Sequence, residues 1–82
     1  MILELDCGNT FIKWRLLGDG SAATGVSGVV DSDKALIEVV REQSVHLRAC
    51  RLVSVRSDEE TAQLISLLER AFAIACHVAC PV

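Results

Sequence analysis

The sequence contains no tyrosine, one tryptophan, two phenylalanines and a single proline among its 82 residues. With so few aromatic side chains, a folded core has to be built from leucine, valine, isoleucine and alanine, which suits packed layers of helix and sheet. An apolar fraction of 51% argues against a disordered chain. At this length we expect one small domain whose core is of marginal size.

Basic charge is also scarce, since eight lysines and arginines face eleven acidic residues and the net charge is −3. A nucleic-acid-binding role therefore has no electrostatic support. No apolar run approaches the roughly 18 residues of a membrane-spanning helix, and residues 1–5 carry no basic region of the kind that opens a secretion signal. We therefore expect a cytoplasmic protein that does not bind membranes.

The four cysteines, Cys7, Cys50, Cys76 and Cys80, lie in apolar contexts. Without a secretion signal they are better interpreted as reduced, buried thiols than as a disulfide framework. Together with His77, the last two could ligate a metal, but the spacing matches no zinc motif and no fourth ligand is near in sequence. Alternation along a strand explains these residues better, so we expect no structural metal there.

The most informative stretch is residues 3–14, where polar groups interrupt two apolar runs. Before Gly8, apolar and acidic residues alternate with the period of two that a half-buried strand requires. Gly8 and Asn9 then indicate a hairpin turn. The leucines of the first strand are expected to share the buried face with Ile12 and Trp14 of the second.

A two-residue loop at Gly8–Asn9 places Asp6 opposite Phe11, and Glu4 opposite Lys13. Asp6 and Lys13 then lie diagonally on one polar face beside the turn. A phosphate with its metal ion needs these parts: N–H groups exposed at the glycine, a hydroxyl, an ammonium and a hard carboxylate. From the pattern alone an ordinary turn explains the same residues, and Glu4 could either pair with Lys13 or reach the metal through water.

The remaining sequence predicts alternating helices and strands. Asp31-Ser32-Asp33 offers a helix start, and Ser57 with Glu60 fits a capping box at the start of a second helix. We expect strands at about 3–7, 11–17, 22–30, 50–55 and 74–80, and helices at about 31–43 and 57–72 with their caps. This order, βββαβαβ, predicts an α/β domain with a mixed sheet and helices packed on it.

Residues 1–10, followed by Ile12-Lys13-Trp14, resemble the first phosphate-binding motif of the type III pantothenate kinases, of general form D-x-G-N-[ST]-x-x-K. Residues 48–56 resemble the next strand and turn of that family, so the resemblance covers essentially the whole chain. It implies a ribonuclease-H-like half-domain of the sugar-kinase, heat-shock ATPase and actin superfamily. Because the family closes two such halves on ATP, residues 1–82 would form a single N-terminal domain, incomplete relative to the family.

The resemblance implies transfer of the γ-phosphoryl group of ATP to pantothenate, giving 4′-phosphopantothenate, the first step towards coenzyme A. Asp6 is expected to help hold the nucleotide-bound metal, and Lys13 to contact the β- or γ-phosphoryl group as a point charge. The nucleotide- and phosphate-binding residues implied in this way are Asp6, Cys7, Gly8, Asn9, Thr10 and Lys13.

The family also implies Mg²⁺ with ATP, a potassium or ammonium ion, and a homodimer of the full-length protein. The base aspartate of its G-x-D-R segment, its D-x-G-T phosphate motif and its dimer-forming helices would all lie beyond Val82. We therefore expect no catalytic residue in this chain and no phosphorylation of pantothenate by the 82 residues alone.

Two other interpretations stay open: a non-catalytic nucleotide-binding or actin-like module, and an accessory transcriptional regulator, a role also described within the family. The acidic balance and the lack of a helix-turn-helix pattern argue against direct DNA contact. Of the other polar residues, Arg56 could point into a cleft or lie in solvent, while His46 and His77 have no catalytic partner at suitable spacing. Trp14 is expected in the core.

Overall fold

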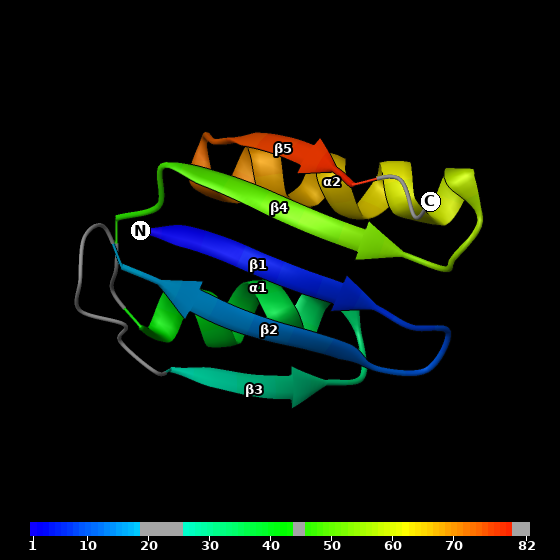
Figure 1. Cartoon of the computed structure of the whole chain (residues 1–82), viewed down its shortest axis with the longest axis horizontal. Coiled ribbons are helices and arrows are strands. Elements are labelled where there is room, and N and C mark those ends of the chain that lie inside the picture. Colours follow the sequence, from blue (N-terminus) through cyan, green and yellow to red (C-terminus); the bar gives the residue numbers. More distant parts are fainter. Residues whose placement is uncertain (19–25, 44–45, 80–82) are drawn as a thin grey trace.

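The computed structural model describes residues 1–18, 26–43 and 46–79 (Figure 1). In these segments five strands form one sheet in the order β3-β2-β1-β4-β5, and two helices pack behind it on a single face. The strands are β1 (Ile2–Cys7), β2 (Ile12–Leu17), β3 (Ser27–Val30), β4 (Ala49–Ser54) and β5 (Ala75–Val78), and the helices are α1 (Asp33–Glu42) and α2 (Asp58–Phe72). The predicted α/β class and the order βββαβαβ are confirmed.

The sheet is mixed. β1, β2 and β3 form an antiparallel meander, whereas β4 runs parallel to β1 and β5 runs parallel to β4. This topology is consistent with a ribonuclease-H-like half-domain of the actin type. Cys7 at the end of β1 lies opposite Ser54 at the end of β4. The loops that follow these two strands therefore meet at one edge of the sheet, and this edge carries the candidate site.

The core lies between the sheet and the helices. Along β1, Leu3, Leu5 and Cys7 are buried while the acidic residues between them are half-buried or exposed, as strand alternation requires. Trp14 is 5% exposed, which confirms its predicted place in the core. The buried cluster consists of Leu3, Leu5, Cys7, Ile12, Trp14, Leu16, Leu36, Val40, Leu47, Cys50, Leu52, Leu64, Leu68 and Ile74.

Trp14 also explains a glycine in the edge strand. Gly28 lies opposite Trp14 in the β2–β3 ladder. A Cβ on Gly28 would lie 2.8 Å from the indole Nε1, so any larger residue there would displace the ring. The third strand was predicted from about residue 22, but residues 22–25 of that prediction lie outside the described residues.

Both helices are capped by a serine, Ser57 as predicted for α2 and Ser32, within the predicted stretch Asp31-Ser32-Asp33, for α1. The Ser32 Oγ accepts a hydrogen bond from the Ala35 N–H at 3.1 Å, and the Ser57 Oγ accepts one from the Glu60 N–H at 3.2 Å. Each bond satisfies a backbone donor that the first helical turn leaves unpaired. Neither of the described helices combines the length and the apolar content needed to cross a membrane.

Candidate functional site

The β1–β2 turn is displaced by one residue from its predicted position. The Gly8 N–H donates to the Phe11 carbonyl at 2.9 Å, so the turn itself consists of Asn9 and Thr10. A Cβ on Gly8 would lie 3.1 Å from the same carbonyl oxygen, and this close approach favours glycine. Because the Gly8 N–H is used within the hairpin, a ligand is left with the N–H groups of Asn9 and Thr10, which have no partner among the described residues.

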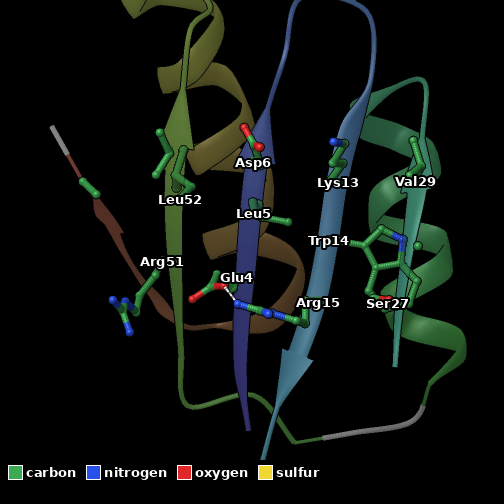
Figure 2. A pocket seen from close by; sticks show the side chains of 13 residues that line it. Glu4, Leu5, Asp6, Lys13, Trp14, Arg15, Ser27, Val29, Arg51 and Leu52 are labelled. Atoms are coloured by element: carbon green, nitrogen blue, oxygen red, sulfur yellow. Dashed lines mark hydrogen bonds and ion pairs between the residues drawn. The ribbon is translucent and has the colours of Figure 1, made fainter. Parts of the chain in front are cut away.

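The displaced turn changes the cross-strand pairs. Asp6 lies directly opposite Lys13, and Glu4 lies opposite Arg15, so the predicted Asp6–Phe11 and Glu4–Lys13 pairs are wrong. The ladder has moved by two residues, an even number, and every side chain therefore stays on its predicted face. Glu4 accepts a hydrogen bond from the Arg15 guanidinium in an ion pair (Figure 2), which occupies the carboxylate that was considered for a metal contact.

Asp6 and Lys13 face each other across the two strands beside the turn (Figure 2). Both side chains are exposed, and neither has an ion-pair partner within the described segments. A cavity of about 320 Å³ opens between them and the turn, and a larger hollow of about 560 Å³ continues along the uncovered face of the sheet. The smaller cavity is lined by Asp6, Gly8, Asn9, Thr10, Phe11 and Lys13.

Five of the six predicted phosphate-binding residues thus line one cavity, and the exception is Cys7. Its side chain is fully buried on the helix-covered face. Burial raises the pKa of the Cys7 thiol to about 11, and the nearby Arg56 guanidinium opposes this only in part. Cys7 is therefore a neutral thiol at pH 7 that packs in the core, and it contributes only backbone to the motif.

The other described cysteines are also buried or half-buried thiols. Cys50 is fully buried and Cys76 is half-buried, and burial raises the pKa of both thiols. Cys76 and His77 are successive residues of β5, so their side chains point to opposite faces of the sheet. Cys80, the third residue of the weighed metal motif, lies outside the described residues. Within those residues no three His, Cys, Asp or Glu side chains gather into a possible metal site.

Arg56 takes neither of the two positions considered for it. Its side chain is only 9% exposed and lies against the turn, where Nε donates to the Gly8 carbonyl at 2.9 Å. Nη1 donates to Asp33 Oδ1 at 2.7 Å in an ion pair. A signal for this contact existed in the sequence: Arg56 follows a strand expected to run parallel, and the carboxyl ends of neighbouring parallel strands share an edge.

The arrangement at this edge can be compared with known proteins. No family model matches the chain. It is 52% identical over 82 residues to a type III pantothenate kinase of Pseudomonas paraeruginosa, 55% identical over 83 residues to one of Pseudomonas putida, and 56% identical over 82 residues to one of Pseudomonas syringae pv. syringae. These alignments cover 99–100% of this chain. The chain matches the N-terminal third of type III pantothenate kinases.

The resemblance inferred from the motif at Asp6 is thereby confirmed for the whole chain. The chain spans 33% of the length of each of these pantothenate kinases. The residues that line the cavity at the β1–β2 turn therefore lie in the part of the chain that aligns with these kinases.

Proposed function

We propose that the chain provides the first phosphate-binding wall of a type III pantothenate kinase, an enzyme that transfers the γ-phosphoryl group of ATP to pantothenate. One observation carries the proposal. Asp6, Lys13 and the Asn9–Thr10 turn converge on a single cavity, in a chain that matches pantothenate kinases over its whole length.

The residues around the cavity suit the phosphates of a nucleotide. The Lys13 ammonium is a compact positive charge that can approach a phosphoryl oxygen, and the Asn9 and Thr10 N–H groups are donors without a partner among the described residues. The Thr10 hydroxyl adds a further donor on the same turn. Phosphoryl transfer depends mainly on positioning and on stabilisation of charge, which are the two contributions that such a turn can make.

The donor set also fits a magnesium ion that arrives with the nucleotide. Mg²⁺ is usually bound through one or two carboxylates together with phosphate oxygens and waters, so the single exposed carboxylate of Asp6 is sufficient. When bound, the ion would neutralise charge on the phosphates. Asp6 would hold the ion, and Lys13 would contact the phosphates.

For the full-length kinase we also propose the properties that the family implies. These are a cytoplasmic location, a potassium or ammonium ion, a homodimer, and a base aspartate outside the third of the kinase that this chain matches. We therefore expect the purified chain to bind Mg-ATP and to form no 4′-phosphopantothenate. Product formation that depends on both ATP and pantothenate in the isolated chain would contradict this division of the active site.

The test is a chimera in which these 82 residues replace the matching third of the Pseudomonas putida relative, to which they are 55% identical. We expect ATP-dependent phosphorylation of pantothenate by the chimera, and its loss in Asp6→Asn and Lys13→Met. Glu38→Gln and Lys34→Met are matched controls, because both residues are exposed on α1. A folded chimera that binds Mg-ATP without turnover would favour a non-catalytic nucleotide-binding module, and absence of Mg-ATP binding would contradict both functions.

A further inference from the structure

Arg56 connects the candidate phosphate turn to the start of α1. Its guanidinium donates to the Gly8 carbonyl at 2.9 Å and to Asp33 Oδ1 at 2.7 Å. Its own backbone N–H donates to the Ser54 Oγ at 3.1 Å, which fixes the residue at the end of β4. Arg56 thus donates three hydrogen bonds, and only 9% of its side chain is exposed to solvent.

The bond to Gly8 determines the direction of the next N–H group. The described residues contain no cis peptide bond, and in a planar trans peptide the carbonyl of one residue and the N–H of the next point in opposite directions. Because the Gly8 carbonyl points towards Arg56, the Asn9 N–H points away from it. Asn9 lines the cavity, whereas Arg56 does not line it and contacts the Gly8 carbonyl, so we take the side of the turn away from Arg56 as the ligand side.

Asp33 keeps Arg56 in this position. A buried guanidinium without a partner would be strongly unfavourable, and the Asp33 carboxylate supplies the opposite charge. The pairing also compensates most of the positive charge of Arg56. Arg56 therefore acts on the turn through a directed hydrogen bond, whereas Lys13, which has no ion-pair partner among the described residues, remains the cation available to a phosphate.

We propose that Arg56 is a positioning residue for nucleotide binding: its bond to the Gly8 carbonyl holds the Asn9 N–H in the direction of the bound phosphate, and Asp33 holds Arg56. The identity of the ligand rests on the proposed function. The ordering of the turn does not, because it follows from contacts within the chain.

The experiment measures both parts on the purified 82-residue chain. Amide ¹⁵N relaxation without ligand gives the order parameters of Asn9 and Thr10, and calorimetric titration with Mg-ATP gives Kd. In the parent chain we expect order parameters near the value of about 0.85 that is typical of a rigid backbone. In Arg56→Met they should fall to about 0.6 or below, as in flexible segments. Mg-ATP should bind about tenfold more weakly, the effect of one directed contact.

Two conservative variants make the test specific. Arg56→Lys keeps the charge, but one ammonium cannot hold Gly8 and Asp33 together, so both readouts should change nearly as much as in Arg56→Met. Asp33→Asn keeps the shape of the side chain that pairs with Arg56 but removes its charge, so the order parameters and the Kd should change less. The controls are Asp31→Asn and Arg70→Met, whose exposed side chains lie just before α1 and in the last turn of α2; both should match the parent.

The outcomes separate the two proposals. Unchanged order parameters in Arg56→Lys and Asp33→Asn would overturn the positioning role, whatever happens to Mg-ATP affinity. If the order parameters fall in these variants but the parent chain binds no Mg-ATP, the proposed function is contradicted and the ordering role of Arg56 is supported. Should Arg56→Met fail to fold, the other two variants decide the question.

Discussion

The two faces of the sheet differ in what covers them and in what they contribute. On the face under the helices, Leu3 and Leu5 of β1 are at most 2% exposed. On the opposite face of the same strand, Glu4 is half-buried and Asp6 is exposed. One strand serves both faces because successive side chains point in opposite directions. Stability should therefore come from one set of alternate residues, and ligand binding from the other.

The uncovered face is itself divided into two rows of residues that run across the strands. The row beside the turn contains a carboxylate and an ammonium that face each other without an ion pair, whereas the next row is closed by the Glu4–Arg15 ion pair (Figure 2). The first row therefore leaves a carboxylate and an ammonium available to a ligand beside the turn, whereas in the second row Glu4 and Arg15 are paired and Arg51 is exposed. The first row consists of Val29, Lys13, Asp6 and Val53, and the second of Ser27, Arg15, Glu4 and Arg51.

The largest contrast between the faces is expected at two neighbouring residues of β4. Leu52 is 1% exposed under the helices, and Leu52→Ala should lower the free energy of unfolding by about 2–5 kcal/mol. Val53 is 39% exposed on the other face, and Val53→Ala should cost less than about 1 kcal/mol. Denaturant unfolding of both variants measures the difference. Equal losses would show that the uncovered face carries as much of the stability as the core.

The free energy of unfolding should depend on pH through a thiol on the buried face of the sheet. The pKa of the Cys7 thiol is raised from 9.0 to about 11 in the fold, so the unfolded chain loses this proton first as the pH rises. The protonated Cys7 thiol therefore contributes on the order of 2 kcal/mol to the free energy of unfolding. This contribution is fully present below pH 9 and is lost as the pH rises from 9 to about 11. Burial raises the pKa of Cys50 as well, which adds a decrease of the same sign.

Free energies of unfolding measured between pH 8 and pH 11 check this expectation. Cys7→Ala should flatten the decrease, whereas Lys34→Met removes an exposed charged group on α1 and should leave it unchanged. A slope in Cys7→Ala identical to that of the parent would indicate that the thiol is solvated in the folded protein.

A change on the uncovered face should separate binding from stability. Asp6→Asn and Lys13→Met should each raise the Kd for Mg-ATP by about tenfold or more, equivalent to about 1.4 kcal/mol. Both should change the free energy of unfolding by less than about 0.5 kcal/mol, since the side chains are exposed. Glu38→Gln on α1 is the control for a lost surface charge. A variant that loses stability and affinity together would remove the distinction between the faces.

The smallest effect is expected in the second row. The side chains of Arg15 and Glu4 are 56% and 31% exposed, and an ion pair of this kind contributes less than about 1 kcal/mol. A double-mutant cycle with Glu4→Gln and Arg15→Met measures the coupling, which should decrease further at high salt. A larger coupling that resists salt would place this pair among the structural elements of the domain.

What could be predicted from the sequence was mostly local. The start of α2 depends on Ser57 and Glu60, three residues apart. The structure confirms Ser57 as the cap, and the Glu60 carboxylate accepts a hydrogen bond from the Ser57 hydroxyl at 3.0 Å. The hairpin register was wrong because Gly8-Asn9 is a strong local turn signal, while the bond from the Gly8 N–H to the Phe11 carbonyl places the turn one residue later. Both registers put the same residues on the buried face, so the hydrophobic pattern could not distinguish them.

The role of Arg56 could not be read from any local pattern. Its partners Gly8 and Asp33 lie 48 and 23 positions away in the sequence, and they become neighbours only when β4 pairs with β1. A solitary arginine after a strand expected to run parallel indicates the edge of the sheet at which it lies, but not which residues it contacts there. The residues of the candidate site were recognisable because the motif is continuous, whereas their support comes from distant parts of the chain.

The most direct test of the account is a titration of the ¹⁵N-labelled chain with Mg-ATP, followed through its amide chemical shifts. We predict saturable shifts centred on residues 6–13, with the largest at Asn9 and Thr10, and their loss in Asp6→Asn. Shifts that fail to saturate, or that centre on α2 while residues 6–13 stay unchanged, would contradict a phosphate-binding role for the turn.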